Sequence, residues 1–148
     1  MAEAPRVSVV IPCFNGGADL PGALASLDAQ TIRDFEVIVV DDGSDDAATL
    51  GVLEGLDGVQ LVRQENCGLA AARNAGMAAA GGAFVLPLDC DDRLEPAFLE
   101  KTLAALDAQP DAAYAFCHLR LAGERSGVLR KEYNFFTQLF LNQLPYCL

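Results

Sequence analysis

The sequence predicts an α/β fold in which helices cover both faces of a mainly parallel sheet. Two observations predict it. Short apolar runs rich in β-branched residues, typical of buried strands, alternate with stretches in which apolar residues recur at helical spacing. Glycine, asparagine and aspartate gather between these segments, where turns are expected. The 148 residues suit one domain with a sizeable core.

The first strand and helix open the chain. Val7–Ile11 is the first predicted strand, and we expect Pro12 to end it. Asn15–Gly17 predicts a turn. A helix follows, with Asp19 as its expected N-cap. Its apolar face carries Leu20, Ala23, Leu24 and Leu27.

The second and third strands flank a short helix. Phe35–Val40 is the second predicted strand, and it runs into the polar turn Asp41–Ser44. We expect Ser44 or Asp45 to cap the next helix. Val59–Val62 is the third predicted strand. The apolar face of the short helix carries Leu50, Leu53 and Leu56.

An alanine-rich helix leads to the fourth strand. Leu69–Ala80 has small side chains that let a helix lie close to its neighbours, and Gly81 and Gly82 end it. Three further elements follow in order. They are a fourth strand over Ala83–Leu88, a helix over Pro96–Ala108 and a fifth strand over Ala112–Leu121.

The last segment differs in composition, so we divide the chain into an α/β domain, 1–121, and a C-terminal extension, 122–148. Tyr133–Leu148 carries apolar residues near helical spacing. We favour a helix that packs on the sheet. The alternative is a helix whose apolar face packs against further chain, and that face would then promote self-association.

The overall charge limits the partners. The net charge is −11 and the isoelectric point is near 4.3, so we expect no nucleic-acid partner, and an anionic ligand needs a bridging cation. The five cysteines form no CxxC pair, which favours free thiols in a reducing compartment. No apolar run reaches the roughly 18 residues of a membrane span. We therefore expect a cytoplasmic protein, with peripheral membrane association of a longer form left open.

Acidic residues follow the predicted strands, where a doubly wound sheet binds its ligands. Asp89, Asp91 and Asp92 come directly after the fourth strand. Crowded carboxylates are costly to ionise without a cation, and Mg²⁺ or Mn²⁺ takes carboxylate and phosphate oxygens as ligands. The three residues therefore predict a divalent metal bridged to a diphosphate. The alternative is a solvated acidic turn.

Two residues elsewhere extend this predicted site. Asp41, at the end of the second strand, can accept the imide N–H of a uracil. Its alternative role is an Asx-type turn. Arg73 lies on the alanine-rich helix, from which it can reach a base or a phosphate. Its alternatives are an ordinary surface arginine and an Arg–Asp ion pair.

Four motifs resemble those of family 2 glycosyltransferases, which have the Rossmann-like GT-A fold. They occur in that family's order and spacing. Val7–Asn15 resembles the opening strand, and Val39–Ser44 the second-strand motif. Asn66–Asn74 resembles the third motif, and Leu88–Asp92 the D-x-D signature.

The resemblance implies a site for a nucleoside-diphosphate sugar, usually a UDP-sugar, with Mn²⁺ or Mg²⁺. It implies that Pro12 and Asn15 border the base and ribose, and that Asp41 binds the base. Arg73 would lie near the base or phosphate. The acidic residues would divide the remaining roles: Asp89 towards the ribose or sugar, Asp91 on the metal and Asp92 facing the sugar.

One family feature is missing. No Glu-Asp pair and no Q-x-x-R-W motif follow Asp92, so no catalytic residue is identified in this chain. We expect a donor-binding fragment of an inverting glycosyltransferase whose acceptor is unknown. Two alternatives stay open: a non-catalytic nucleotide-sugar-binding module, and another metal-dependent, phosphate-handling α/β enzyme.

Overall fold

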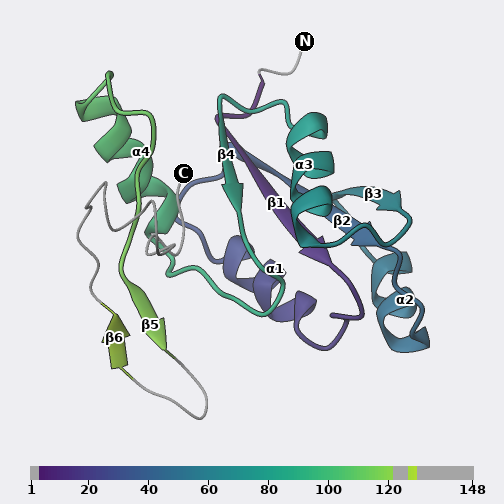
Figure 1. Ribbon diagram of the computed structural model, residues 1–148. Coiled ribbons are helices and arrows are strands. Elements are labelled where there is room, and N and C mark those ends of the chain that lie inside the picture. The colour runs from purple at the N-terminus through teal and green to yellow at the C-terminus, as the bar shows by residue number, and fades with distance from the viewer. Residues whose placement is uncertain (1–3, 122–126, 130–148) are drawn as a thin grey trace. The chain divides into compact units, whose positions relative to one another are not determined.

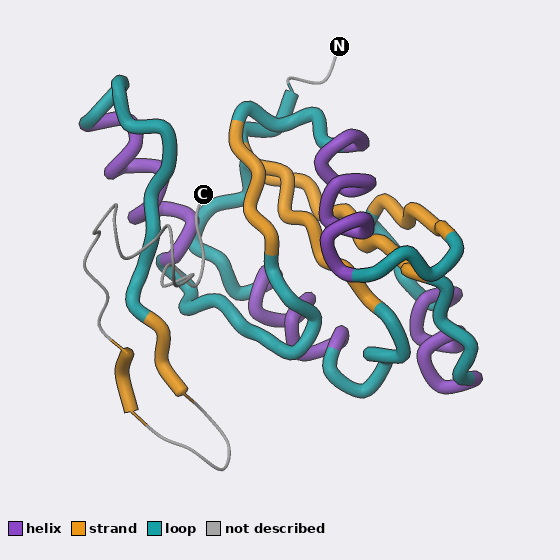
Figure 2. Tube along the Cα trace, viewed as in Figure 1, coloured by secondary structure: helices purple, strands orange, loops and turns teal. Residues whose placement is uncertain are grey.

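The computed structural model describes residues 4–121 and 127–129. The chain divides into two compact units, Met1–Lys101 and Thr102–Leu148, and each is described by itself. The first unit holds a four-stranded parallel sheet in the order β3-β2-β1-β4 (Figures 1 and 2). The predicted α/β fold with a mainly parallel sheet is confirmed.

The central strand β1 (Val7–Cys13) is buried along its whole length, and its residues Val7–Val10 have a neighbouring strand on each side. It pairs with β2 (Phe35–Asp42) and with β4 (Phe84–Pro87), while β3 (Gln60–Gln64) lies beyond β2. The chain builds outwards from β1 to β3 and then returns to place β4 on the opposite side of β1. The strand order therefore reverses between β1 and β4, where open α/β sheets bind ligands.

Helices cover the two faces of the sheet. Because βαβ crossovers are right-handed, α1 (Leu20–Asp28) and α2 (Ala47–Glu54) lie on one face, and α3 (Leu69–Ala79) lies on the other (Figure 1). The small residues of α3 let it approach the sheet closely. A Cβ on Gly76 would lie 2.2 Å from Val10 Cγ1.

One predicted helix cap is confirmed in position and one is wrong. Asp19 is the N-cap residue of α1, as predicted, although its backbone is helical and its side chain makes no capping hydrogen bond. The cap of α2 is Asp46, whose carboxylate accepts from the Thr49 amide at 2.8 Å. Ser44 and Asp45 lie before this N-cap position. Their side chains instead accept hydrogen bonds from Asn15.

The second unit differs from the predicted fifth strand. It contains most of α4 (Phe98–Ala108) and a two-stranded antiparallel sheet of β5 (Leu119–Leu121) and β6 (Gly127–Leu129). Within the expected strand 112–121, only the last three residues form a strand, and Phe116 makes an isolated bridge. The first part is rich in alanine, which is depleted in strands, and the Ala112 amide closes a turn on the Gln109 carbonyl.

Two further features concern the membrane and the C-terminus. Across 4–121 and 127–129, no helix combines the length and apolar character that crossing a bilayer requires. The predicted helix over Tyr133–Leu148, with its suggested self-association, lies outside the described residues. It stays a prediction.

Candidate functional site

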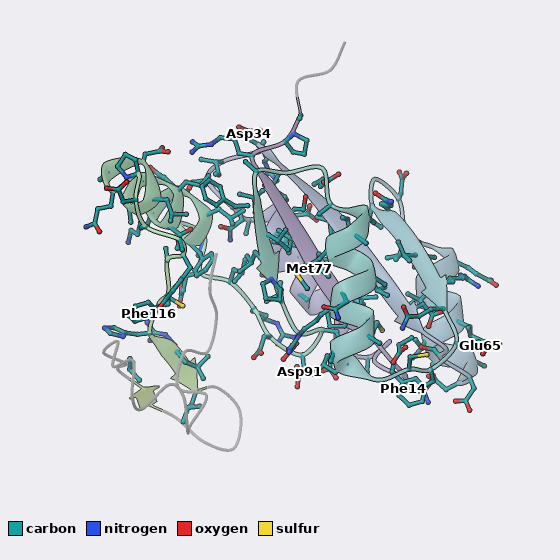
Figure 3. The ribbon with its side chains drawn as sticks, turned by 45° about the horizontal axis from the view of Figure 1, so that its top comes forward. Phe14, Asp34, Glu65, Met77, Asp91 and Phe116 are labelled. Carbon is teal, nitrogen blue, oxygen red and sulfur yellow. The ribbon has the colours of Figure 1, made fainter. Side chains whose placement is uncertain are left out.

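The carboxyl ends of the parallel strands bring three loops to one edge of the sheet. Cys13, at the end of β1, pairs in register with Asp41 near the end of β2. On the other side of β1, Leu88 donates its amide N–H to the Val10 carbonyl at 2.9 Å. The chain then enters the acidic loop, Asp89–Asp92, directly after this residue. Figure 3 shows Phe14 and Asp91 at this same lower end of the sheet.

Arg73 and Asp89 form an ion pair at this edge. An Nη2 hydrogen of Arg73, on α3, is donated to Asp89 Oδ1 at 2.5 Å, and each side chain is 35% exposed. The Arg73 Nε is buried and has no hydrogen-bond partner. The structure therefore shows the Arg–Asp pair that the sequence left as an alternative. The predicted contacts of both residues with a ligand stay predictions.

The remaining acidic residues of the loop are crowded. Asp91 is exposed and makes no hydrogen bond or ion pair within the described part of the chain. Burial raises the pKa of Asp92, and the charges of Asp91 and Asp89 raise it further, against a smaller lowering by Arg93. A cation at the loop would relieve this repulsion.

This donor set suits Mg²⁺ or Mn²⁺. Those ions are commonly held by one or two carboxylates, with water and phosphate oxygens completing the shell. Over 4–121 and 127–129, no group of three or more His, Cys, Asp or Glu side chains is arranged so that it could hold a metal ion. A metal at the loop would therefore need oxygens of a bound ligand in addition to the one or two carboxylates.

Helix α1 holds the chain that follows the acidic loop. Gln30 at its end is 3% exposed. Its Nε2 donates to the Ser26 and Glu95 carbonyls, each at 3.0 Å, and its Oε1 accepts from the Leu99 amide at 3.1 Å. The Ser26 hydroxyl accepts from the Leu94 amide at 3.1 Å. The sequence did not single out Gln30, because its partners become neighbours only when the chain folds.

Asp41 forms the Asx turn that the sequence offered as its alternative. Its carboxylate accepts from the Ser44 amide at 2.9 Å, and the residue is 4% exposed. The predicted contact with a base stays a prediction. Asp41 lies at the predicted edge of the sheet, and its carboxylate shapes the loop that begins there.

Asp42 has a role that sequence reasoning missed. One carboxylate oxygen accepts from Gln64 Nε2 at 2.7 Å and the Cys67 amide at 2.9 Å, and the other accepts from the Gly68 amide at 2.8 Å. The Cys67 hydrogen bond contributes most to lowering the Asp42 pKa, with Gln64 and Gly68 adding to it and burial opposing it. Asp42 therefore fixes the loop that leads into α3 and Arg73.

Asn15 joins the loops after β1 and β2. Its Nδ2 donates to Asp45 Oδ1 at 2.8 Å, and its Oδ1 accepts from the Asp45 amide at 3.0 Å and the Asp46 amide at 3.3 Å. Its φ of 52° is a conformation that asparagine tolerates better than most residues. Asn15 therefore positions both loops, and its predicted place beside the base and ribose is not tested by these contacts.

Pro12 does not end β1 as the sequence predicted. The strand continues to Cys13, and Pro12 is buried and pairs in register with Val40. The proline is tolerated because the last β1 residue that pairs with β4 is Val10, so β1 has one neighbouring strand at this point. Its predicted role beside the nucleotide stays a prediction.

Phe14 is a further candidate that sequence reasoning missed. Its side chain is 50% exposed in the loop after β1, at the edge where Asp91 also lies (Figure 3). An exposed aromatic ring can stack on a base. The sequence signal that could have identified Phe14 is its position two residues after Pro12, which lies within β1.

Two thiols meet beneath the acidic loop. Cys13 is 1% exposed, and Cys90 is partly buried between Asp89 and Asp91. A hydrogen bond from the Cys90 thiol is the main cause that lowers the Cys13 pKa to about 7. The same bond raises the Cys90 pKa above its ordinary value, and burial adds to this. The pair therefore favours a thiolate on Cys13.

Comparisons of sequence agree with this arrangement. A family model described as Glycosyl transferase family 2 matches residues 8–146. "Uncharacterized glycosyltransferase YibD" of Escherichia coli (strain K12) is 34% identical over 121 residues, which is 80% of this chain and 35% of that protein. "Putative glycosyltransferase EpsH" of Bacillus subtilis (strain 168) is 37% identical over 112 residues, which is 74% of this chain and 33% of that protein.

Solved structures share the fold. S. aureus TarS 1-349 in complex with UDP has a TM-score of 0.74 and 28% identity, over 82% of this chain and 38% of that one. Mannosyltransferase PcManGT from Pyrobaculum calidifontis, in complex with GDP-Man and Mn²⁺, has a TM-score of 0.66 and 26% identity, over 80% of this chain and 36% of that one. These likenesses confirm the GT-A type of fold.

The chain spans about a third of the length of the curated relatives named above. Its family model match nevertheless extends over most of the 148 residues, from the first strand onwards. Together with the parallel sheet and the acidic loop at the point where strand order reverses, this match assigns the chain to a family. The chain belongs to glycosyl transferase family 2.

Proposed function

We propose that this chain binds a UDP-sugar as the donor-binding part of a glycosyltransferase. The acidic loop at the end of β4 carries the proposal, because it lies where the strand order reverses and where parallel α/β sheets bind nucleotides. S. aureus TarS, a structural relative, has been solved with UDP and with UDP-GlcNAc. PcManGT has been solved with GDP-Man and Mn²⁺, so a nucleoside-diphosphate sugar is the shared ligand class.

We assign the divalent metal to Asp91, with Mn²⁺ or Mg²⁺ as the ion. Asp91 is exposed and unpaired in the described chain, whereas Asp89 is engaged with Arg73. Asp92 lies beside it, and burial, with the nearby charges of Asp91 and Asp89, raises its pKa. When bound, the cation would neutralise charge on the diphosphate as it leaves.

The other side chains of this edge would bind and orient the donor. Phe14 offers an exposed ring for the base, and Asp41 offers a carboxylate oxygen as acceptor for a base N–H. Arg73 places a guanidinium beside Asp89, where it can meet a phosphate while its charge stays partly balanced. Asn15 holds the two loops that frame the base, and Pro12 lies buried beneath them.

The proposed reaction is displacement of UDP from the sugar by an acceptor hydroxyl, with inversion at the sugar carbon. This step needs a base that takes the hydroxyl proton. We assign that base to no residue of this chain, so the proposal for this chain is confined to binding the donor. The alternative, a non-catalytic nucleotide-sugar-binding module, shares every donor contact and differs only in that base.

Calorimetric titration of UDP tests the proposal. With Mn²⁺ present we expect binding that chelation of the metal abolishes, and we expect Asp91→Asn to weaken it about tenfold to a hundredfold because a metal ligand is lost. Asp57→Asn is the matched control. It removes the same charge from an exposed position before β3, at the opposite edge of the sheet, and should leave the affinity unchanged at about 150 mM salt, where distant charges are screened.

Two results would contradict the assignment. UDP binding that does not depend on the metal would remove the role of the cation. Equal affinities for wild type and Asp91→Asn would remove the role of Asp91. A radiolabelled-sugar transfer assay on a longer form of the protein then separates the transferase from the binding module.

A further inference from the structure

Two cysteine sulfurs lie together directly under the acidic loop. Cys13 comes from the end of β1, and Cys90 stands between Asp89 and Asp91 after β4. The bare backbone of Gly16 makes room for both. A Cβ built on Gly16 would lie 2.7 Å from the Cys90 sulfur and 3.3 Å from the Cys13 sulfur. Both sulfurs therefore lie close to the same point beside Gly16.

The two sulfurs are also joined by a hydrogen bond. The Cys90 thiol donates to the Cys13 sulfur, which keeps the two sulfurs within reach of each other. The thiolate is the nucleophilic form of cysteine. Both residues are free cysteines, as are Cys67 and Cys117 elsewhere in the described chain. The proposed sugar transfer uses neither sulfur of the pair.

We propose that Cys13 and Cys90 form a peroxide-sensitive dithiol whose oxidation to a disulfide alters the acidic loop. The ligand class of this modification site is a small hydroperoxide, of which hydrogen peroxide is the simplest. Cys90 is partly exposed, so peroxide reaches the pair from that side, while Cys13 is 1% exposed.

The reaction balances in two steps. One thiol of the pair loses its proton as its sulfur attacks peroxide. An S–O bond forms as the O–O bond breaks, and the first oxygen leaves as water with that proton. The sulfur of the second cysteine then attacks the sulfenic sulfur. The S–S bond forms as the S–O bond breaks, and the second oxygen leaves as water with the proton of the second thiol. Two thiols are oxidised and one peroxide is reduced to two waters.

Oxidation should move the acidic loop because a disulfide demands a shorter separation than a hydrogen bond. The S–S bond is about 2.05 Å long, well below van der Waals contact. Closing it draws Cys90 towards β1 and carries its neighbours Asp89 and Asp91 with it. This consequence for binding rests on the proposed function, whereas the formation of the disulfide does not.

Peptide mapping tests the disulfide directly. Trypsin places all five cysteines in different peptides, and Cys13 falls in 7–33 while Cys90 falls in 74–93. After peroxide treatment and alkylation of the reduced full chain, we expect these two peptides to be linked, with the mass of their sum less two hydrogen atoms. Cys13→Ser and Cys90→Ser should each abolish the linked species, and Cys67→Ser, at an exposed cysteine, should not.

Titration of UDP in Mn²⁺, before and after peroxide, tests the consequence. We expect the Kd to rise about tenfold or more on oxidation and to return on treatment with dithiothreitol. The ratio of oxidised to reduced Kd is compared within each variant, so that any change in the basal affinity of Cys13→Ser cancels. That variant should show a ratio of one, and Cys67→Ser should show the wild-type ratio.

The outcomes separate the two proposals. Cys13 and Cys90 that stay alkylatable after peroxide, or that link to other cysteines, overturn the dithiol. A linked pair with unchanged UDP affinity overturns its effect on the loop. A reduced chain that binds no UDP contradicts the proposed function, while the peptide map still decides whether the dithiol exists.

Discussion

Single atoms decide how close α3 can lie to the sheet. Gly76 packs where any side chain would meet Val10 and Val40, and Ala72 beside it is fully buried. This close approach helps to place Arg73, one residue after Ala72, within reach of Asp89 at the end of β4. A residue without chemistry of its own thus supports the geometry of the candidate site.

We predict that Gly76→Ala destabilises the protein by about 1–3 kcal/mol, the usual cost of overpacking a core. The added Cβ would lie 2.2 Å from Val10 Cγ1, so α3 or β1 must shift. Gly51→Ala is the matched control because it also lies in a helix but meets nothing within 4 Å. It should stabilise by about 0.5–1 kcal/mol through helix propensity. Urea unfolding measures the stability of both variants. Equal changes in the free energy of unfolding for Gly76→Ala and Gly51→Ala would contradict the prediction.

Asp42 gives stability a defined pH dependence. Its pKa is lowered in the folded state, chiefly by the Cys67 amide, so folding favours the charged form. The contribution is therefore fully present above the unfolded pKa of about 3.9 and is lost as pH falls through the lower folded value.

We predict that Asp42→Asn lowers the free energy of unfolding at pH 7 and that the difference from wild type shrinks below about pH 4. Urea unfolding at a series of pH values from neutral to acid measures this. Asp57→Asn, at an exposed residue in the same unit, controls for the general loss of negative charge. A difference that is constant with pH would show that the carboxylate charge is not what matters.

At the scale of elements, the candidate site is built from loops that tie to one another. Asn15, after β1, holds Asp45 and Asp46, after β2. Asp42 holds the loop before α3 in the same way. Gln30, at the end of α1, holds the segment after the acidic loop. These ties place side chains from distant parts of the sequence along one edge.

We predict that Asn15→Asp destabilises the protein by about 1 kcal/mol or more, because a carboxylate replaces the amide that donates to Asp45. Two acceptors would then face each other with like charge. The double variant Asn15→Asp with Asp45→Asn restores one donor and one acceptor. It should recover most of the lost stability. A double-mutant cycle by urea unfolding measures the coupling, and additive effects would contradict the link between the loops.

At the scale of the whole molecule, the net charge shapes which ions the chain attracts. The chain carries 21 acidic and 10 basic residues, so its field attracts divalent cations and repels nucleotides. In the proposed site, a bound cation would offset both the local crowding of Asp92 and the overall repulsion of an anionic ligand. Of these two effects, only the crowding of Asp92 depends on the acidic loop itself.

We predict that Mn²⁺ binding weakens between about 10 mM and about 150 mM salt, as the Debye length falls from about 30 Å to about 8 Å. The double variant Glu54→Gln and Asp57→Asn removes two exposed charges far from the loop in sequence. This double variant should bind Mn²⁺ more weakly than the wild type at low salt and equally well at high salt. A salt-independent affinity would show that only the nearest carboxylates matter. Titration calorimetry measures both.

The sequence by itself determined the order of strands and helices in the first unit. Apolar runs and helical spacing place β1 to β4 and α1 to α3 within a few residues of their observed bounds. The position of the acidic loop after β4 follows from the same pattern, because a buried strand must end where charged residues begin. The family resemblance, carried by four motifs, is confirmed by the family model.

Only the tertiary structure decided which polar groups meet. Asn15 with Asp45, Asp42 with Cys67, and Gln30 with Glu95 are hydrogen-bonded across 25 to 65 residues, a separation that no local pattern encodes. An Arg–Asp ion pair is one of three roles that the sequence leaves open for Arg73, and only the crossover from α3 to β4 identifies Asp89 as the partner. Hydrophobic periodicity is local and reports elements, whereas polar contacts depend on the path of the whole chain.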